Sequence, residues 1–593
     1  MNDLLVAEDL KEKQTNSDWI APDTHGQNFF EMDQSLQGLL KLYLPEALRE
    51  HMTPHYSRLG EIAGGKLDEL ARMSDKHAPV LHARDPFGRD EDWLEFHPSY
   101  REMEQIGFGD FGIHCMSRTP GVLGWQDKVP PLAKYIFQYL FVQSEFGLMC
   151  PISATDTSAM LIERYGDEAT KNRFLPGMHS NDMNNILKGA QFMTEKTGGS
   201  DVGQIELTAK YEDGEWRLYG DKWFCSHTDS SIILILARSG DPASGSKGLS
   251  LFLVPRWLED GSRNAYRTLR LKPKMGTKSM ATGEVRFEGA VGYLLGEEGR
   301  GLRQTMDQVN LSRLSHGVRA AAMMRRCLNE ALTAARGRTA FGKSLDAHPL
   351  MARQLLKIML PTEQALSAFL YTAAVMEKAD AGDETAATVL RLLTPLIKFR
   401  ACRDNIPVAT AAMEVRGGNG FIEDWVNARL VRDAHTGVLW EGTSSIVALD
   451  VARRAVPQVQ AHKALGAAMH GLLDSSDGLP GQFGGELAGM VDRAVAFADE
   501  VAREPESEAF SRQATNALYH AMTATLLAHE GAIMAKKTGD ARRMLLARLV
   551  IDHRMRPHDP MSLDGGRIER EAGALLLRDA PVSLEDAVRV LAS

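Results

Sequence analysis

Residues 432–450 have the sequence RDAHTGVLWEGTSSIVALD, with a single glutamate, Glu441, near the middle. The glutamate follows a short apolar run and precedes Gly442 and the hydroxyls of Thr443 and Ser444. Desolvation in an apolar pocket raises the pKa of a carboxyl group, which suits it to accept a proton near neutral pH. The alternative is a solvated acid at the start of a helix, with Thr443 or Ser444 as the cap. This stretch alone leaves both interpretations open.

The composition of the whole chain narrows the class of protein. With 593 residues and 44% hydrophobic composition, the chain is expected to form several domains. The net charge of -10 argues against a general affinity for nucleic acid or anionic membranes. Five dispersed cysteines without a Cys-x-x-Cys pair predict a reduced, cytoplasmic protein, and we expect no metal site. The N-terminus lacks the apolar core of a signal peptide, and no stretch approaches the ~18 uninterrupted apolar residues of a membrane helix.

Hydrophobic periodicity predicts an α+β multidomain fold. Apolar residues at helical spacing predict an N-terminal α-helical domain over residues 1–188. Short apolar runs and an Asp-Gly turn predict a middle β-barrel or sandwich domain over 189–292. Long amphipathic segments predict a C-terminal four-helix-bundle domain over 293–455, and a helical extension follows over 456–593.

Within these domains the pattern predicts particular elements. Three long helices are expected over residues 302–336, 349–379 and 384–413. The N-terminal domain is expected to be all-α, with a loop around residues 84–92. The segment from 474 to 485 is rich in Gly, Ser and Asp and is interpreted as a linker.

Three further motifs suit a ligand with a ring and phosphates. In QFMTEKTGGSD, residues 191–201, two glycines let the main chain approach a phosphate or a planar ring, although an ordinary loop is equally compatible. KWFCSH, residues 222–227, places aromatic residues and a hydroxyl at the end of a strand, where aromatics commonly belong to the core. RGRTAFGK, residues 336–343, could hold a pyrophosphate or simply complement the end of a helix.

Taken together and in this order, these segments resemble the FAD-dependent acyl-CoA dehydrogenase family. The resemblance covers about residues 100–455. It rests on MTEKTGGSD at 193–201, KWFCS at 222–226, MGTKS at 275–279, LLGEEGRG at 294–301, RTAFG at 338–342, GGNGF at 417–421 and WEGTS at 440–444. The order of an α, a β and a second α domain is also that of the family. Within it, Phe96-His97-Pro98, Cys150-Pro151-Ile152, Met413-Glu414-Val415 and Leu449-Asp450-Val451 are similar to the AidB-like branch of alkylation-response flavoproteins.

The resemblance implies a set of cofactor and substrate residues. Those implied for FAD are Met193, Thr194, Ser200, Phe224, Ser226, Arg338, Phe341, Glu414, Gly417, Gly418, Thr443 and Ser444. Of these, the residues from Arg338 to Gly418 would reach FAD held mainly by the partner subunit. Those implied for the acyl-CoA substrate are Ser200, Asn310, Arg313 and Gly442. The chain departs from the family pattern at two positions, since Phe224 stands where most members have Trp and Glu414 where they usually have Gln.

Glu441 matches the catalytic base of the family. Some members carry the base on the long helix instead, at the position of Ser312, and a serine cannot act as such a base. The implied reaction is removal of an α-proton by Glu441 while the β-hydrogen leaves as hydride to flavin N5. The resemblance further implies a role in fatty acid metabolism, an electron-transfer flavoprotein as electron acceptor, and a homotetramer built as a dimer of dimers.

Two functions of different class follow. The first is a working acyl-CoA dehydrogenase, and the second is an AidB-like flavoprotein of the alkylation response that binds DNA and has little dehydrogenase activity. The extension has fifteen Lys and Arg residues against nineteen Asp and Glu, and this balance disfavours DNA binding. One local arginine cluster could still form a basic patch or a solvated helix face: Arg542, Arg543, Arg548, Arg554 and Arg556.

Overall fold

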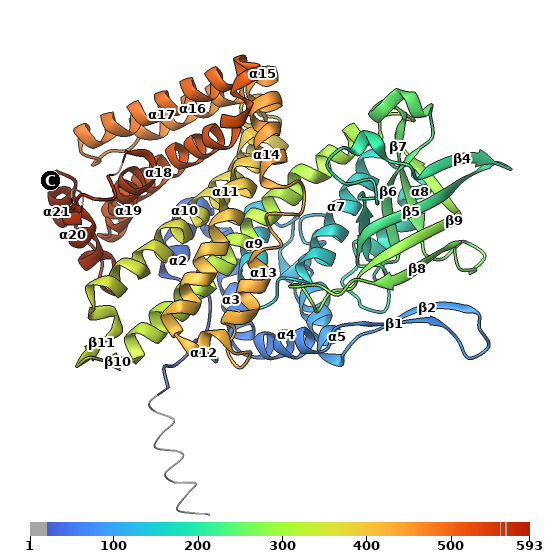
Figure 1. Cartoon of the computed structure of the whole chain (residues 1–593), viewed down its shortest axis with the longest axis horizontal. Helices are drawn as coiled ribbons and strands as arrows, with labels where there is room; N and C mark the ends of the chain where they lie inside the picture. Colours follow the sequence, from blue (N-terminus) through green and yellow to red (C-terminus); the bar gives the residue numbers. More distant parts are fainter. Residues whose placement is uncertain (1–19, 558, 564–565, 593) are drawn as a thin grey trace, which may run out of the picture.

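The structure is a computed structural model that describes residues 20–557, 559–563 and 566–592. Part of the expected N-terminal domain, residues 1–19, therefore lies outside the described residues. The described chain has an α+β multidomain fold with helices at the N-terminus, a β-barrel in the middle and two further helical regions (Figure 1). The predicted fold class is confirmed.

The N-terminal region is mainly helical but contains a β-hairpin, so the all-α expectation was wrong. Its helices are α2 (Gln34–Tyr43), α3 (Glu46–Gly64), α4 (Lys66–Lys76), α5 (Pro98–Glu104), α6 (Pro131–Val142), α7 (Met149–Tyr165) and α8 (Glu168–Met178). The hairpin consists of β1 (Val80–Arg84) and β2 (Asp90–Glu95). Asp92 binds the barrel, because its carboxylate accepts hydrogen bonds from Arg263 at 2.9 Å and from the backbone N–H of Thr268 at 2.9 Å. The residues that stabilise this hairpin are distant in sequence, so local periodicity did not show it.

The middle region is a closed β-barrel. Its strands are β3 (Gly189–Phe192), β4 (Thr208–Glu212), β5 (Glu215–Ser226), β6 (Ile232–Arg238), β7 (Leu249–Pro255), β8 (Tyr266–Leu271) and β9 (Thr282–Leu295). The sheet has the order β3-β6-β4-β5-β9-β7, with β8 also paired to β9, and the additional pairing of β6 with β7 closes it. Asp213 and Gly214 both have positive φ, as a tight turn between antiparallel β4 and β5 requires.

Three long helices form the helical bundle that follows. They are α9 (Gly301–Gly337), α10 (Pro349–Asp380) and α11 (Glu384–Arg416), each slightly longer than the sequence pattern predicts. The smaller elements of this region are β10 (Thr339–Ala340), β11 (Lys343–Ser344), α12 (Gly418–Phe421), α13 (Asn427–Ala434) and α14 (Ser444–Asp450). Helix α9 starts beside the barrel and crosses the molecule, so it links the barrel to the far end of the bundle (Figure 1).

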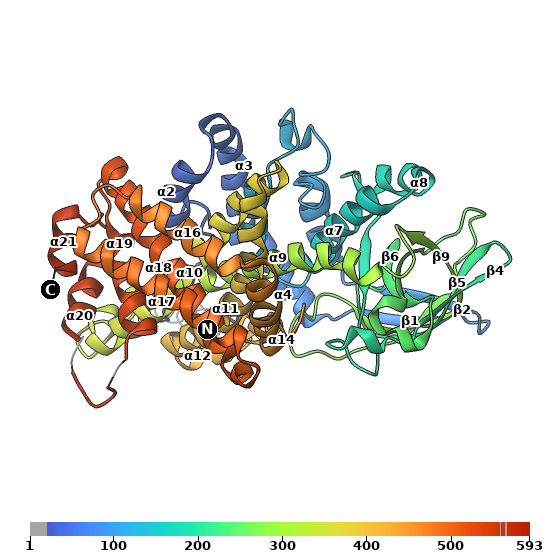
Figure 2. The ribbon, with the colours of Figure 1, turned by 90° about the horizontal axis from the view of Figure 1, so that it is seen from above.

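The extension packs on the bundle at the end of the molecule away from the barrel (Figures 1 and 2). Its helices are α15 (Val456–Val459), α16 (Ala461–Asp474), α17 (Gly481–Arg503), α18 (Ser511–Thr538), α19 (Arg542–Val550), α20 (Gly566–Leu576) and α21 (Leu584–Leu591). The expected linker at 474–485 is instead a short turn between α16 and α17, followed by the first turn of α17. Helix α18 also contacts α10, α11 and α14, so the extension is continuous with the bundle core.

A buried ion network joins the extension to the bundle. Arg543 on α19 donates to Glu363 on α10 at 2.7 Å and to Glu530 on α18 at 2.8 Å. Glu363 also accepts from Arg325 on α9, and all four side chains are buried. Burial alone would raise the pKa of Glu363, but the charges of Arg325 and Arg543 outweigh it and lower this pKa to about 2. The network therefore consists of ionised groups sealed between the two regions.

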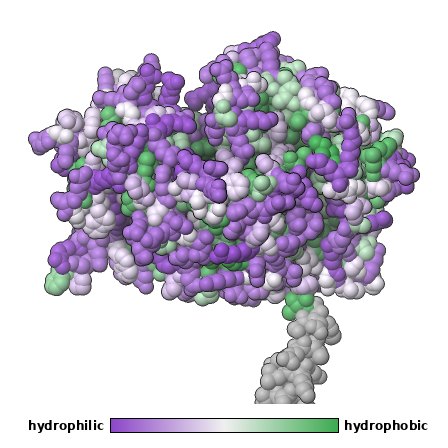
Figure 3. Space-filling view, turned by 180° about the vertical axis from the view of Figure 1, so that it is seen from behind, coloured by the Kyte–Doolittle hydropathy of each residue, from purple (hydrophilic) through white to green (hydrophobic). Residues whose placement is uncertain are grey.

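The arginine cluster of the extension is largely neutralised by neighbouring acids. Arg543 belongs to the buried network, and Arg542 pairs with Asp540 at 2.8 Å. Arg548 and Arg556 share the carboxylates of Asp552 and Glu486, and Arg554 lies 4.0 Å from Asp404. One face of the protein is mostly hydrophilic with small separate hydrophobic patches (Figure 3), and no described helix is long and apolar enough to cross a membrane.

Candidate active site

Glu441 lies in the loop between α13 and α14, beside the middle of α9. The hydroxyl of Ser312 on α9 donates a 2.9 Å hydrogen bond to the Glu441 carboxylate. The backbone of Glu441 has φ of 56°, followed by Gly442 at 94°, so a left-handed turn directs the side chain towards α9. Thr443 holds the N-cap position of α14 without a side-chain capping bond. Glu441 is therefore half-buried and hydrogen-bonded, and it is not a solvated acid at a helix cap.

Aromatic packing holds this loop in place. The ring of Trp440, directly before the base position, lies edge-on to His316 with centroids 5.6 Å apart and also contacts Phe146 at 6.4 Å. These contacts enclose Glu441 on its N-terminal side. Burial raises the pKa of the Glu441 carboxyl, while the Ser312 hydrogen bond and the positive charges of Arg313 and Lys398 oppose the shift.

Two buried cations lie close enough to this carboxylate to influence its pKa. Lys398 on α11 is 1% exposed and donates a hydrogen bond to the backbone oxygen of Gly442. Arg319 on α9 is also 1% exposed, and its guanidinium donates to the hydroxyl of Ser315 at 3.0 Å. Within the described residues neither cation has a carboxylate at ion-pair distance. Burial lowers the pKa of both cations, and the negative charge of Glu441 is one of the contributions that oppose this shift.

Two polar residues on α9 lie one or two positions from Ser312. The side-chain oxygen of Asn310 is buried and has no hydrogen-bond partner among the described residues. Arg313 donates to Asp450 at 2.6 Å, and Asp450 also pairs with Arg391. Arg313 is thus held in a fixed orientation, whereas the side-chain oxygen of Asn310 is an unused acceptor.

On the barrel side, the glycine-rich turn brings the main chain close to Thr194. Gly198 has φ of 128°, and a Cβ added at Gly199 would lie 2.7 Å from the Thr194 hydroxyl oxygen. Residue 199 must therefore be glycine for this approach. Below the turn, buried Glu195 pairs with Lys222 of β5 at 2.6 Å and accepts from backbone N–H groups after the turn. This pair fixes the turn to the barrel.

Four other residues that the resemblance implies for FAD lie at the end of β5 or in the segment that follows β3. Phe224 is 55% exposed, and Lys272 lies over its ring at 5.0 Å. The Ser226 hydroxyl lies 3.2 Å from that of Thr282, and the side-chain ammonium of Lys222 donates a hydrogen bond to the backbone oxygen of Met193. Ser200 is exposed at the tip of the glycine-rich turn. An exposed aromatic ring beside hydroxyl groups can accommodate a planar ligand.

A second group of predicted cofactor residues lies at the far end of the bundle: Arg338, Phe341, Glu414, Gly417 and Gly418. The Arg338 guanidinium lies 3.7 Å from the position of a Cβ on Gly417, which has φ of 75°, and nothing lies within 4 Å of one on Gly418. Phe341 is 96% exposed. Arg338 follows Arg313 by 25 residues along α9, a distance of about 37 Å at 1.5 Å per residue. This group therefore lies at the end of α9 away from the barrel.

The residues at the barrel edge and those at the far end of the bundle both fit parts of an FAD molecule. The turn at Gly198 and Gly199 leaves room for a close approach of a ligand to Thr194, and exposed Phe224 offers a ring face. At the far end, open space above Gly418 and exposed Phe341 provide a surface without side-chain obstruction.

Sequence analysis missed several residues of this site. Lys398 interrupts the apolar run TPLIKF, and Arg319 lies in an Ala-rich segment of α9. A charged residue within an apolar segment is the sequence signal that could have identified both. Glu195 and Lys222 lie within the motifs at 191–201 and 222–227, but no local pattern shows that they pair. Ser312 was recognised only as unable to act as a base, and its hydrogen bond to Glu441 depends on how α9 crosses the loop.

The fold and this site define a flavoprotein oxidoreductase with an α, β, α core. The sequence profile of the acyl-CoA dehydrogenase middle domain matches residues 190–290, and that of the acyl-CoA dehydrogenase C-terminal domain matches residues 299–456. The profile of the N-terminal domain of the adaptive response protein AidB matches residues 20–185.

Full-length relatives lead to the same family. Acyl-CoA dehydrogenase family member 11 of Caenorhabditis elegans is 30% identical, over 72% of this chain and 70% of its own length. AidB of Escherichia coli strain K12 is 35% identical, over 65% of this chain and 70% of its own length. The crystal structure of Caenorhabditis elegans ACDH-11 in complex with C11-CoA superposes with a TM-score of 0.83 at 25% identity, covering 91% of this chain and 93% of that one. The chain belongs to the acyl-CoA dehydrogenase family, whose members are FAD-dependent oxidoreductases.

Proposed function

We propose that the chain catalyses α,β-dehydrogenation of an acyl-CoA thioester, with Glu441 as the base. The observation that carries the proposal is the half-buried Glu441 carboxylate, aimed at α9 by a left-handed turn and held by Ser312. Burial raises the pKa of Glu441, which increases the affinity of its carboxylate for a proton. The crystal structure of the ACDH-11 relative contains C11-CoA, which supports an acyl-CoA as the substrate class.

The bound FAD supplies the acceptor for the hydride that leaves the substrate β-carbon. The chain itself supplies the base and the groups that stabilise the enolate-like charge. Within the described residues the backbone N–H of Glu441 has no hydrogen-bond partner, so it is free to donate to the thioester oxygen. One such donor is typically worth ~3 kcal/mol in the transition state. The buried side-chain oxygen of Asn310, two positions before Ser312 on α9, has no hydrogen-bond partner among the described residues, and we propose that it binds a polar group of the acyl-CoA.

We further infer that two copies of the chain complete each FAD site. Arg338 and Gly417 lie at the end of the bundle away from the barrel, about 37 Å from Arg313 along α9, which supports a cofactor site completed by a second copy. A dimer that places this end of one copy beside the barrel edge of the other would join both groups, and a dimer of dimers is our proposed assembly. An electron-transfer flavoprotein is the proposed electron acceptor.

The proposal is tested by purifying the full-length protein and mixing it with a panel of acyl-CoA thioesters. We expect bound flavin with the absorption spectrum of FAD, bleaching of this flavin by at least one thioester, and turnover with an artificial electron acceptor. A flavin that no acyl-CoA bleaches, over chain lengths from short to long and both straight and branched, would overturn the dehydrogenase proposal.

A second candidate function is DNA binding in the manner of the AidB-like branch, favoured by the match of residues 20–185 to the AidB N-terminal domain. The paired arginines of the extension weigh against it, because duplex binding depends on cations that are free to contact phosphate. Titration of the full-length protein with duplex DNA at low salt distinguishes the two candidates. Binding that weakens steeply with salt would support the second, and no binding would exclude it.

Removing the positive charge of Lys398 is expected to shift the pH dependence of the reaction. Burial lowers the pKa of Lys398 to about 8, so it is largely protonated at neutral pH, and its charge stabilises the ionised form of Glu441. Without that charge the pKa of Glu441 rises, so the acid limb of the kcat/KM profile should move to higher pH, by about one unit. The variant is Lys398→Met and the measurement is the pH profile of flavin bleaching.

The matched control is Lys357→Met, which removes an exposed lysine on neighbouring α10. Its profile should coincide with that of the unmodified protein. If the acid limb of Lys398→Met also coincides, while its FAD content is unchanged, Lys398 does not act on the base.

A further inference from the structure

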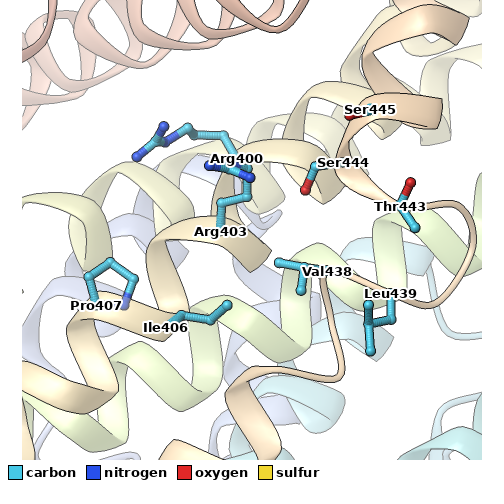
Figure 4. Close-up of a pocket in the computed structure, with 9 residues that line it drawn as sticks. All are labelled: Arg400, Arg403, Ile406, Pro407, Val438, Leu439, Thr443, Ser444 and Ser445. Atoms are coloured by element: carbon cyan, nitrogen blue, oxygen red, sulfur yellow. The ribbon is translucent and has the colours of Figure 1, made fainter.

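A cavity of about 520 Å³ lies between α11 and the two segments that flank Glu441 (Figure 4). Its α11 side consists of Arg400, Arg403, Ile406 and Pro407. Its other side consists of Val438 and Leu439, which precede the base, and of Thr443, Ser444 and Ser445, which follow it. The cavity thus has a cationic and hydroxyl-rich part and an apolar part, and neither arginine was among the predicted site residues.

The arginines bring more positive charge to this cavity than the neighbouring acids compensate. Arg400 pairs with Asp404, four residues later on α11. Arg403 has no carboxylate at ion-pair distance among the described residues. Its guanidinium lies over the ring of Phe399, 5.8 Å from the ring centroid. Arg512 on α18 is a further cation nearby, and burial together with Arg512 and Arg400 lowers the pKa of Arg403.

The extension helps to form this cationic wall. Asn516 on α18 accepts a 3.0 Å hydrogen bond from the guanidinium of Arg400, so the extension orients an arginine of the bundle. Helix α18 also contacts α14, whose first turn carries the hydroxyls of the cavity. Both walls of the cavity are therefore braced by the same helix of the extension.

The Arg403 guanidinium and the hydroxyl groups on the facing wall suit the oxygens of a diphosphate, because a guanidinium without an acid partner can donate two parallel hydrogen bonds. The nitrogens of Arg400 are already bonded to Asp404 and Asn516, so Arg400 adds positive charge to the wall. The adjoining apolar part, including Leu439 at 62% exposure, suits a planar ring such as a purine. We propose that Arg403 binds the diphosphate of FAD, beside an Arg400 that Asn516 on α18 of the extension holds in place. The inference rests on the proposed function, in which Thr443 and Ser444 contact FAD. Coenzyme A also carries an adenosine diphosphate, and the experiment separates the two sources.

The test measures flavin affinity and does not depend on turnover. Full-length protein is freed of flavin and titrated with FAD, FMN and riboflavin, and binding is followed by quenching of flavin fluorescence. Arg403→Gln should raise the Kd for FAD about tenfold, in line with the loss of one charge-assisted contact, and leave the Kd for riboflavin unchanged. Arg403→Lys keeps the charge and should lose less. Arg493→Gln, which removes an exposed arginine on α17, is the control and should match the unmodified protein.

The outcomes distinguish this inference from the proposed function. Unmodified protein that binds no FAD would refute the proposed function itself. Unmodified protein that binds FAD, together with an Arg403→Gln variant of equal FAD affinity, would overturn only the present inference. A variant with unchanged FAD affinity but weaker acyl-CoA binding by the flavin-loaded protein would assign the cavity to coenzyme A and also overturn it. Weaker binding of FAD, with riboflavin unaffected, supports it.

Discussion

Glu441→Gln is expected to retain FAD and to lose acyl-CoA-dependent bleaching of the flavin by a factor of about 10³ or more, as removal of a positioned base typically does. Glutamine has nearly the same shape as glutamate, and its side-chain oxygen can still accept the hydrogen bond from Ser312. The turn at positive φ and the packing of Trp440 are also preserved. What disappears is the group that can take the α-proton. The measurement is stopped-flow bleaching under anaerobic conditions at saturating thioester.

The control for this variant is Glu288→Gln, which removes an exposed acid on the outside of the barrel and should bleach at the normal rate. Flavin content of both variants is compared before the reaction. A Glu441→Gln protein that holds FAD and bleaches at the normal rate would show that another group is the base, and Ser312 could not replace it because its hydroxyl is not basic enough.

Arg543→Met is expected to lower the free energy of unfolding by about 3–5 kcal/mol, since breaking a buried ion pair leaves an uncompensated charge. Glu363 and Glu530 would both lose a cation that lies within 2.8 Å. The stabilisation that lowers the pKa of Glu363 to about 2 operates fully above its ordinary value of 4.5 and fades as the pH falls below it. The loss should therefore be largest near neutral pH and smaller at pH 3. Chemical denaturation at both pH values measures it.

Two comparisons make this result specific. Arg556→Met removes a partly exposed arginine of the same cluster and should cost less than about 1 kcal/mol, because exposed pairs contribute little. Arg325 still pairs with Glu363 in this variant, so Glu530 is the charge left without a cation. Adding Glu530→Gln to Arg543→Met removes that charge and should recover part of the lost stability. If Arg543→Met and Arg556→Met cost the same, the buried network does not hold the extension to the bundle.

Much of the architecture was predictable because its signals are local. The three long helices of the bundle repeat apolar residues at a helical period over many turns, and the Asp213-Gly214 turn specifies the hairpin of β4 and β5. Both patterns arise from interactions within a few residues of one another. The hairpin at 80–95 lacks such a pattern, because what holds it is the contact of Asp92 with the barrel.

The meaning of charged residues was the least predictable part. The sequence presents Arg543 as one of five arginines that could form a basic surface, but the fold buries it between two glutamates. Whether a charge faces water or an acid depends on how α19 packs on α10 and α18, and such packing joins residues about 180 positions apart. No local pattern contains that information.

By itself the sequence determined the order of helical and β regions, the motifs of a flavin-binding family, and the place of Glu441 among them, because these depend on residues close together in the chain. Only the tertiary structure decided that Glu441 is half-buried, bonded to Ser312 and faced by Lys398 and Arg319. The crossing of α9 and α11 behind one loop brings together residues more than forty positions apart. Desolvation and the charges across that crossing set the proton affinity of the carboxylate, and neither exists until the helices pack.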